Sequence, residues 1–260
     1  MVPVALTIAG SDSSGGAGIQ GDLKTFAAFD VYGATVVTAL TAQSTRGVHA
    51  VAEVTATFVG AQLDAVLDDL DVAAAKTGML ARAAVIEIVA GRIRARGLRH
   101  LVVDPVLVAS TGARLLEEQA IGVLRTLLLP LATLVTPNLH EAEVLTGRPV
   151  RDPATMRDAA RALVDLGARA ALVTGGHLPG DPVDVLHDGR HLHDLAGTRI
   201  GAVSPHGTGC ALSAAVTARL ARGDGLLDAV GTARHWVARA IAAAPAIGHG
   251  ARPVGMPRPV

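Results

Sequence analysis

Residues that can bind ligands or catalyse reactions follow the short apolar runs of this sequence. Such runs are typical of parallel strands, whose carboxyl ends meet at one edge of a sheet, where α/β proteins bind their ligands. Polar loops also follow strands in proteins that have no site there, but the repetition along this chain favours a site at that edge. The segments concerned are 10–18, Gln43, 76–79, Asp104, 136–141 and 174–177.

One of these segments, Gly16-Ala17-Gly18-Ile19-Gln20-Gly21, has the G-x-G-x-x-G spacing of a dinucleotide-binding turn. That function predicts an acidic residue at the end of the second strand to bind the ribose, and Gln43 stands there instead. The preceding loop, 11–15, is longer than such a turn allows. The sequence also has no G-x-x-x-x-G-K-[ST] motif. The pattern therefore argues against a dehydrogenase and against a P-loop protein.

Asp22 lies on or beside the apolar stripe that Ile19, Leu23 and Phe26 form on the helix that follows. A carboxylate in that position costs free energy unless it is paired or bound to a ligand. The alternative is an aspartate favoured near the start of a helix by the helix dipole. Position alone does not decide between the two.

A second glycine-rich turn, His206-Gly207-Thr208-Gly209-Cys210, opens an apolar helix. Free backbone N–H groups at such a helix start form an anion hole suited to phosphate. In the first turn, the helix dipole is expected to lower the pKa of Cys210 from its free value of about 8.5. A lone cysteine is more often a small packing residue, but its place directly after Gly-Thr-Gly favours a function.

Asn138 and Glu141 stand three residues apart at the start of another helix. This spacing presents an amide and a carboxylate on one side, which suits Mg²⁺ held through water molecules. It also suits a capping box, in which Asn138 is the N-cap and Glu141 reaches back to it. From the residues alone, the cap is the preferred interpretation.

The elements that position these residues alternate between strand and helix, which predicts an α/β doubly wound fold with a mostly parallel sheet covered by helices on both faces. Asp152-Pro153 marks a helix start, and Asp188-Gly189 predicts a small antiparallel hairpin at a sheet edge or in a lid. The tail from Gly248 is rich in Gly and Pro, and no linker divides residues 1–260, so a single domain is expected. The expected strands are Val4–Ala9, Thr35–Ala42, Val72–Ala75, Leu101–Val103, Leu134–Thr136 and Ala170–Val173, with hairpin strands at Pro182–His187 and Arg190–Leu195. The expected helices are 18–29, 57–69, 82–95, 117–128, 154–166, 208–222 and 225–243.

The composition excludes several classes of protein. The chain has 260 residues, 50% hydrophobic but only 2% aromatic, which indicates an aliphatic core. Its 23 basic and 23 acidic residues cancel, so it carries no electrostatic footprint for nucleic acid or anionic membrane. The single cysteine excludes an internal disulfide and fits a reducing cytoplasm. The apolar start, Val2–Ala9, lacks a basic region and is expected to be a strand, not a signal peptide, and the sequence has no apolar stretch long enough to span a membrane.

Taken in order, these segments resemble one family, the hydroxymethylpyrimidine/phosphomethylpyrimidine kinases of thiamine biosynthesis, within the ribokinase-like superfamily. The resemblance spans nearly the whole chain, and it is the ordered set of short motifs that makes it specific. The matching pieces are Leu6–Asp12, Ser14–Gln20, Asp22–Phe26, Thr38–Gln43, Lys76–Met79, Val103–Val106, Thr136–Asn138 with Glu141 and Ala142, Gly175–His177, His206–Cys210 and Gly248–Gly250.

The resemblance implies an ATP-dependent kinase for a small hydroxymethylpyrimidine, and it implies a role for each matching residue. Gln43 and Asp22 would hydrogen-bond the aminopyrimidine ring, which Met79 and Val106 would pack against, with Gly10 beside them. Three further sets complete the implied site. Mg²⁺ would be organised by Asp104 and Glu141, charge on the transferred phosphoryl group would be stabilised by Gly207, Thr208 and Gly209, and the nucleotide would meet Asn138, Thr174, His206 and Arg234.

Cys210 occupies the position where ribokinase relatives carry an aspartate base, so the resemblance implies that it orients or deprotonates the substrate hydroxyl. Three positions depart from the family pattern. Thr174 and Arg234 stand where lysines near the nucleotide are usual, and Ser13 replaces a usual proline. The lysine that is usual at the position of Thr174 is expected to contact phosphate. Because it is missing here, the first phosphorylation is a firmer expectation than the second, in which the substrate already carries a phosphate.

Two other functions remain open from the sequence. A pyridoxal kinase shares the fold and phosphorylates a similar ring, although Cys210 and Met79 favour the pyrimidine branch. A catalytically idle relative that only senses a pyrimidine is disfavoured by the intact Asp104, Glu141 and Gly-Thr-Gly turn. The resemblance also suggests a homodimer.

Overall fold

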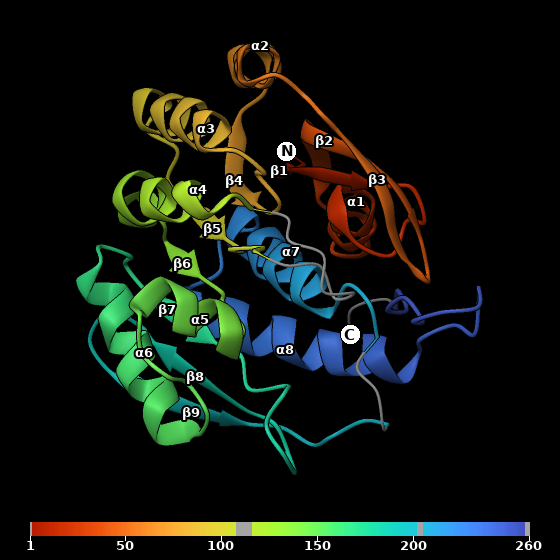
Figure 1. Cartoon of the computed structure of the whole chain (residues 1–260), viewed down its shortest axis with the longest axis vertical. Helices are drawn as coiled ribbons and strands as arrows, with labels where there is room; N and C mark the ends of the chain where they lie inside the picture. The colour runs from red at the N-terminus through yellow and green to blue at the C-terminus, as the bar shows by residue number, and fades with distance from the viewer. Residues whose placement is uncertain (1, 108–115, 202–204, 258–260) are drawn as a thin grey trace.

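A single sheet organises the protein in the computed structural model, which describes residues 2–107, 116–201 and 205–257. Within these ranges the sheet has nine strands in the order β3-β2-β1-β4-β5-β6-β7-β8-β9 (Figure 1). The strands from β2 to β7 in this order run parallel to their neighbours, which confirms the predicted doubly wound, mostly parallel sheet. The strands are β1 Val4–Asp12, β2 Tyr32–Ser44, β3 Gly47–Glu53, β4 Val72–Thr77, β5 Leu101–Val103, β6 Leu134–Val135, β7 Ala171–Val173, β8 Val183–His187 and β9 Leu192–Ala196.

Antiparallel hairpins extend the sheet at both edges. The predicted hairpin is β8–β9, and its turn uses Gly189 at φ 95°, a backbone conformation that favours glycine. The hairpin at the opposite edge, β2–β3, was not predicted, because β3 is largely exposed and lacks the apolar alternation of a half-buried strand. The prediction also made three strands too short, since β1 extends to Asp12, β2 includes Gln43 and β4 includes Lys76.

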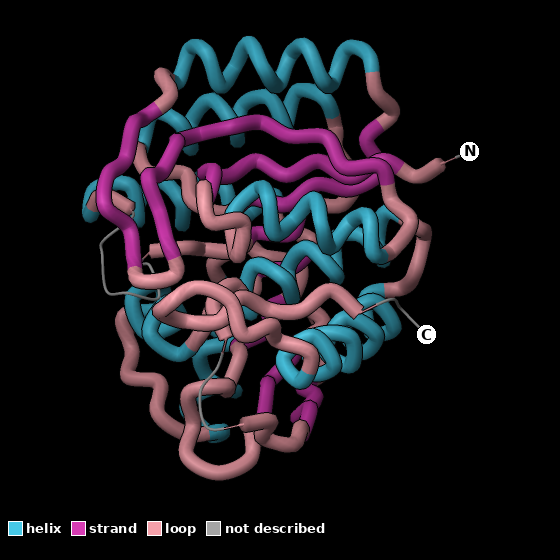
Figure 2. Tube along the Cα trace, turned by 90° about the vertical axis from the view of Figure 1, so that its right-hand side faces the viewer, coloured by secondary structure: helices cyan, strands magenta, loops and turns pink. Residues whose placement is uncertain are grey.

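Helices cover the sheet on both faces (Figure 2). One face packs against α1, α7 and α8, and the other against α2 to α6. Alternate residues of a strand enter opposite cores, as the period of two requires: Val102 faces one core, while Leu101 and Val103 face the other. The helices are α1 Gly18–Ala28, α2 Ala56–Asp69, α3 Ala83–Arg96, α4 Glu118–Val123, α5 Leu139–Thr146, α6 Pro153–Asp165, α7 Thr208–Ala221 and α8 Leu226–Ala242.

The predicted helix 117–128 is present but changes character along its length. After α4 the chain continues as a π-helical segment, Leu124–Leu128, and then as a 3₁₀ turn, Leu129–Leu131. Pro130 has no N–H to donate, so the α-helical hydrogen-bond pattern cannot continue through it. Among the described residues, no helix is both long and apolar enough to cross a membrane.

Candidate active site

The loop after β1 is held by the carboxylate of Asp12. It accepts hydrogen bonds from the backbone N–H groups of Ser14 at 2.8 Å, Gly16 at 3.1 Å and Ala17 at 2.8 Å. The loop ends at Gly18, where φ is 56° and a Cβ atom would lie 2.5 Å from the carbonyl oxygen of Gly10. The G-x-G spacing therefore serves a tight turn and a close backbone approach.

The second glycine-rich turn packs directly on the first. Gly207 has φ 86°, and a Cβ atom there would lie 2.1 Å from the carbonyl oxygen of Gly16. Gly207 is the N-cap of α7, and no side chain caps this helix. Backbone N–H groups at a helix start of this kind can bind an anion such as a phosphoryl group.

Beneath these turns lies a buried ion pair. The Lys76 ammonium group is 2.9 Å from Oδ1 of Asp22, and the Thr7 hydroxyl donates to Oδ2 of Asp22 at 2.6 Å. Both charged side chains are 0% exposed. Burial raises the pKa of Asp22, and the Lys76 charge opposes this shift. Burial lowers the pKa of Lys76, but the charges of Asp22 and Asp104 raise it above its ordinary value. The partner that the sequence left open for Asp22 is therefore Lys76, which engages both of its carboxylate oxygens.

Asp104 follows β5 and is also buried. Its Oδ2 accepts a hydrogen bond from the Ser213 hydroxyl at 2.9 Å and lies 3.9 Å from the Lys76 ammonium group. Burial raises the pKa of Asp104, while the Lys76 charge and the hydrogen bonds from Ser213 and Cys210 lower it. Residues from β4, the end of β5 and α7 thus meet at one point.

The expected lowering of the Cys210 pKa is wrong. Burial raises the pKa of the Cys210 thiol to about 12, and the Asp104 and Asp22 carboxylates add to this effect. The Lys76 charge and a backbone hydrogen bond involving Gly18 act in the opposite direction but do not offset it. The helix dipole was the reason for the expectation, and the carboxylates that surround the thiol could not be placed from the sequence.

Asn138 and Glu141 form the preferred capping box at the start of α5. Glu141 N–H donates to Oδ1 of Asn138 at 3.0 Å, and Asn138 N–H donates to Oε2 of Glu141 at 2.9 Å. The Glu141 carboxylate also faces Asp104. Burial, followed by the Asp104 charge, raises the pKa of Glu141 to about 8, although hydrogen bonds from the Asn138 and Leu107 backbones act to lower it. The same glutamate therefore caps the helix and belongs to the carboxylate cluster.

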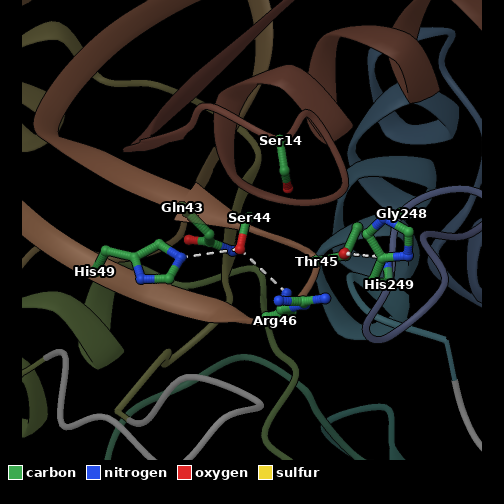
Figure 3. Close-up of a pocket in the computed structure, with 8 residues that line it drawn as sticks. All are labelled: Ser14, Gln43, Ser44, Thr45, Arg46, His49, Gly248 and His249. Carbon is green, nitrogen blue, oxygen red and sulfur yellow. Dashed lines mark hydrogen bonds between the residues drawn. The ribbon is translucent and has the colours of Figure 1, made fainter.

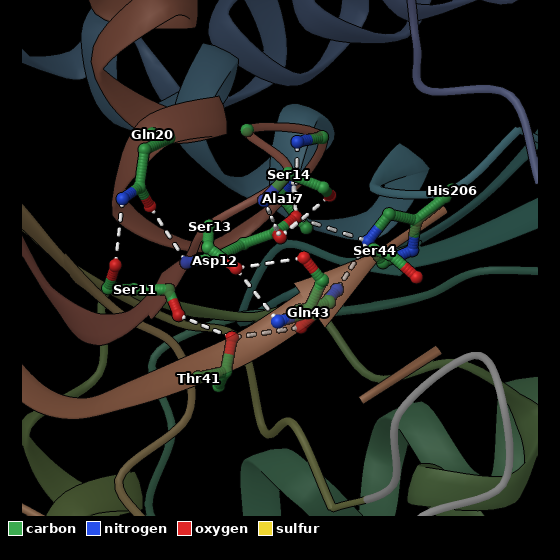
Figure 4. Close-up of polar contacts among 12 residues, drawn as sticks. Ser11, Asp12, Ser13, Ser14, Ala17, Gln20, Thr41, Gln43, Ser44 and His206 are labelled. Atoms are coloured by element: carbon green, nitrogen blue, oxygen red, sulfur yellow. Dashed lines mark hydrogen bonds and ion pairs between the residues drawn. The ribbon is translucent and has the colours of Figure 1, made fainter. Parts of the chain in front are cut away.

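Gln43 lies near the end of β2, in the group of polar residues shown in Figure 4. Its backbone is fixed by the Ser13 hydroxyl, which lies 2.8 Å from both the N and the O atom of Gln43. Its side-chain amide lies 2.9 Å from Nε2 of His206 and 3.3 Å from Oγ1 of Thr41. Ser13, which stands where a proline is usual, therefore contacts the backbone of Gln43 through a hydroxyl group that proline lacks.

The other residues expected to contact the ring lie on neighbouring strand ends. A Cβ atom on Gly10 would be 3.1 Å from Sδ of Met79, so the methionine side chain lies over this glycine. The Met79 carbonyl accepts a hydrogen bond from the Thr38 hydroxyl at 2.6 Å. Val106 is partly exposed two residues after Asp104, whose carbonyl accepts its N–H at 2.9 Å.

The residues expected at the nucleotide form two groups. Thr174 and Asn138 form an isolated parallel β-bridge, and the N–H of the neighbouring Gly175 donates to Oδ1 of Asp184 at 2.8 Å. Asp184 also accepts from Nε of Arg234 at 2.7 Å, which ties Arg234 to the same region. His206 is separate from this group and contacts Gln43 instead.

A pocket of about 540 Å³ opens beside Gln43 (Figure 3). The β2–β3 hairpin forms one wall with Arg46 and His49, and the tail forms the other with Gly248 and His249. The tail is tied to the hairpin because Ala251 N–H donates to the Thr45 carbonyl at 2.8 Å.

Three buried contacts of this site were not recognised from the sequence, namely those made by Lys76, Ser213 and Asp12. Ser213 stands one helical turn after Cys210, so the spacing of three residues could have placed both on one face of α7. Among the described residues, no group of three or more His, Cys, Asp or Glu side chains forms a metal site.

Comparison with known proteins shows which family shares this sequence. The model of the family described as phosphomethylpyrimidine kinase matches residues 12–255. The chain belongs to this family. It is 52% identical over 258 residues to the hydroxymethylpyrimidine/phosphomethylpyrimidine kinase of Rhizobium meliloti, covering 98% of this chain and 97% of the relative.

Solved structures with the same fold include two kinds of vitamin kinase. The Bacillus subtilis pyridoxal kinase in an ADP complex has a TM-score of 0.93 and 39% identity, with 98% of each chain covered. The phosphomethylpyrimidine kinase of Clostridium difficile has a TM-score of 0.83 and 38% identity, covering 92% of this chain and 99% of that one. The predictions of the family, of kinase activity and of a ribokinase-like fold are confirmed.

Proposed function

We propose that the chain transfers the γ-phosphoryl group of ATP to the hydroxymethyl group of 4-amino-5-hydroxymethyl-2-methylpyrimidine, and then phosphorylates the monophosphate, in thiamine diphosphate biosynthesis. The observation that carries the proposal is the uncapped start of α7, packed on the loop after β1 and beside the buried Asp104. Family membership supports the substrate and the phosphoryl donor.

The main catalytic contribution of the chain is the stabilisation of charge on the transferred phosphoryl group. The N–H groups of Gly207, Thr208 and Gly209 are fixed before the reaction because the two glycine turns are in backbone contact. Donors that are already oriented need no reorganisation as charge develops, and such stabilisation commonly contributes more to the rate of phosphoryl transfer than any other effect. Because burial holds the Cys210 thiol in its protonated form by raising its pKa, we assign Cys210 to orienting the substrate hydroxyl rather than to removing its proton.

Mg²⁺ fits the residues present. Burial of Glu141 close to the Asp104 charge raises its pKa, and a divalent cation between such carboxylates would relieve their repulsion. The buried Thr136 hydroxyl at the carboxyl end of β6 has no hydrogen-bond partner among the described residues, so a polar ligand is missing nearby. Asp104 and Glu141 would hold the ion, which would neutralise charge on the ATP phosphates. The ion's remaining ligands would be water and phosphate oxygens.

The substrate ring and the nucleotide occupy opposite ends of the sheet edge in this proposal. Gln43 would read the ring, with Met79, Gly10 and Val106 against it, while the nucleotide would lie near Thr174, Asn138 and Arg234. Asp22 is assigned as the charge partner of Lys76, since both of its oxygens are engaged and it is 0% exposed. We further propose that the chain acts as one kinase domain, as a homodimer in the cytoplasm.

A pyridoxal kinase is the second candidate, and the observation in its favour is the TM-score of 0.93 to the Bacillus subtilis pyridoxal kinase. A competitive panel of hydroxymethylpyrimidine, its monophosphate and pyridoxal, with ATP and mass detection of products, separates the candidates. We expect the pyrimidine to be phosphorylated first and pyridoxal slowly. Preferred turnover of pyridoxal would overturn the proposal, and ligand binding without ADP formation would indicate a sensor.

Gln43→Ala tests the proposed ring contact. Loss of a hydrogen-bond partner that the bound ring would cover should weaken pyrimidine binding by about 1–3 kcal/mol, while ATP binding should stay unchanged in titration calorimetry. Val51→Ala, at an exposed position of the same hairpin that does not line the pocket, is the control and should change neither. Pyrimidine binding equal to wild type in Gln43→Ala would remove Gln43 from the site.

A further inference from the structure

The side-chain amide of Gln43 lies between two polar neighbours, His206 on one side and Thr41 on the other (Figure 4). His206 in turn contacts Asp12. Oδ2 of Asp12 lies 3.4 Å from Nε2 of His206, and the same nitrogen lies 2.9 Å from the Gln43 amide. On the other side of the amide, Thr41 Oγ1 lies 3.3 Å away and donates its hydrogen to the Ser11 carbonyl at 2.8 Å. The hydrogen-bonding capacity of each neighbour determines whether the amide oxygen or the amide NH₂ group of Gln43 can face that neighbour.

The Asp12 side determines the atom that faces His206. Burial raises the pKa of Asp12, but hydrogen bonds from His206, Ser14 and Ala17 lower it to about 2, so the group is an ionised carboxylate that can only accept. An attractive contact with it requires that Nε2 of His206 carries a hydrogen. A nitrogen that carries a hydrogen is complemented by the amide oxygen of Gln43, not by its NH₂ group.

The Thr41 side gives the same answer independently. A hydroxyl group has one hydrogen, and that of Thr41 is directed at the Ser11 carbonyl. Toward Gln43 the Thr41 oxygen can therefore only accept, which requires the amide NH₂ group to face it. In Figure 4 the amide is drawn with Nε2 toward His206, and a turn of 180° about its last bond exchanges the two atoms without moving any neighbour. Only the turned amide satisfies both sides.

We propose that His206, held by Asp12, is a positioning residue that fixes the orientation of the Gln43 amide and thereby sets which ring edge the kinase accepts. The inference rests on the proposed function, because it matters only if Gln43 reads the ring. The amide oxygen of Gln43 uses one lone pair for His206, and the amide NH₂ group uses one hydrogen for Thr41. One lone pair and one N–H of the amide therefore remain for the ligand. An aminopyrimidine complements them with its amino hydrogen and the adjacent ring nitrogen, in a fixed order relative to the hydroxymethyl group.

The test uses two ligands with opposite edges. The natural 4-amino ring presents donor then acceptor, whereas its 4-oxo analogue, 5-hydroxymethyl-2-methylpyrimidin-4-one, presents acceptor then donor. Dissociation constants for both are measured with wild type, His206→Met and His206→Gln. Methionine removes the Nε2 donor and leaves only the Thr41 contact at 3.3 Å to orient the amide, so the turned and unturned amide become closer in free energy. The preference for the amino ring should then fall about tenfold, partly through tighter binding of the oxo analogue. Glutamine restores an N–H donor and should restore the preference.

If His206 has only a structural role, its substitution should weaken the binding of both ligands equally and leave the ratio of their dissociation constants unchanged. This result would overturn the proposal. Thr41→Val tests the opposite side of the amide without touching His206 and should also narrow the preference, while Thr41→Ser should keep it. These variants keep the test decisive if His206→Met does not fold. A ¹⁵N NMR spectrum of wild type that shows Nε2 of His206 without a hydrogen would also refute the proposal.

The Gln43→Ala variant separates the two levels of the argument. If it binds the amino ring as wild type does, the proposed ring contact fails and the orientation of the amide has no bearing on selectivity. If it loses the amino ring while His206→Met keeps the wild-type ratio of dissociation constants, the proposed function stands and the positioning role is wrong.

Discussion

The Lys76→Met substitution removes the ammonium group that pairs with Asp22 inside the protein. Methionine has a similar length and fills the same space, so the main change is the loss of one charge. The Asp22 carboxylate keeps the Thr7 hydroxyl at 2.6 Å but has no cation beside it, and no water reaches it because the side chain is 0% exposed. The variant therefore measures the cost of a buried carboxylate without its partner.

The expected cost is large relative to the stability of a protein. Removing one partner of a buried pair destabilises by about 3–5 kcal/mol, against a total of about 5–15 kcal/mol. For a chain of this size each kcal/mol shifts the melting temperature by roughly 2–4 °C, so Lys76→Met should melt roughly 6–20 °C below wild type. Adding Asp22→Asn removes the stranded charge and keeps an acceptor for Thr7, so the double variant should recover at least half of the loss.

Urea unfolding and thermal melting, both at pH 7, provide the assay. Arg161→Met is the matched control, because it breaks an ion pair with Asp158 whose side chains are 52% and 63% exposed. Such surface pairs contribute about 0–1 kcal/mol, so this control should melt within a few degrees of wild type. If Lys76→Met is as stable as the control, or if the double variant is less stable than the single one, the reasoning about the buried pair is refuted.

Three further predictions concern the carboxylates and the thiol. Asp104→Asn should lower turnover and raise the Mg²⁺ requirement, since a hard cation loses a charged ligand; the exposed Asp158→Asn is its control, and equal Mg²⁺ curves would exclude the role. The pKa of Glu141 is raised from 4.5 to about 8, so the folded protein keeps a proton that the unfolded chain releases, and stability without Mg²⁺ should fall as pH rises through this window. Glu141→Gln should flatten that fall in urea-unfolding curves, and an unchanged slope would assign it to other groups. Because burial raises the pKa of Cys210 to about 12, iodoacetamide should label it slowly at neutral pH and faster in alkali, and rapid labelling at pH 7 would contradict this environment.

The sequence predicted the architecture well because the strands of the parallel sheet are buried on both faces. Runs such as Leu101–Val103 and Leu134–Val135 have no other reason to be apolar throughout, and Asp188-Gly189 marked the edge hairpin by its turn chemistry alone. Strand β3 was missed for the opposite reason. Its residues are mostly exposed, so its position depends on backbone pairing with β2, which leaves no periodic signal in the side chains.

The sequence named the residues of the candidate site but not the charges that surround them. Motif order identified Asp104, Glu141 and Cys210, whereas their pKa shifts come from side chains that the fold brings to them from distant segments. Lys76 and Asp22 are separated by 54 residues, and Ser213 and Asp104 by 109. Helix-local arguments therefore succeeded for the capping box at α5 and failed for the thiol at α7, where tertiary neighbours dominate.

The contact between the tail and the β2–β3 turn has a consequence for how the protein is made. His249 and Gly250 donate to Oγ1 of Thr45 across separations of 204 and 205 residues, and Arg252 and Val254 pair with the backbone of His206. A ribosome releases Thr45 and the whole of β2 long before it has polymerised these partners. Contacts so distant in sequence close late in folding. A nascent chain can therefore fold most of its sheet while one wall of the pocket beside Gln43 is still missing, so this pocket is complete only after Gly248 and His249 have been synthesised.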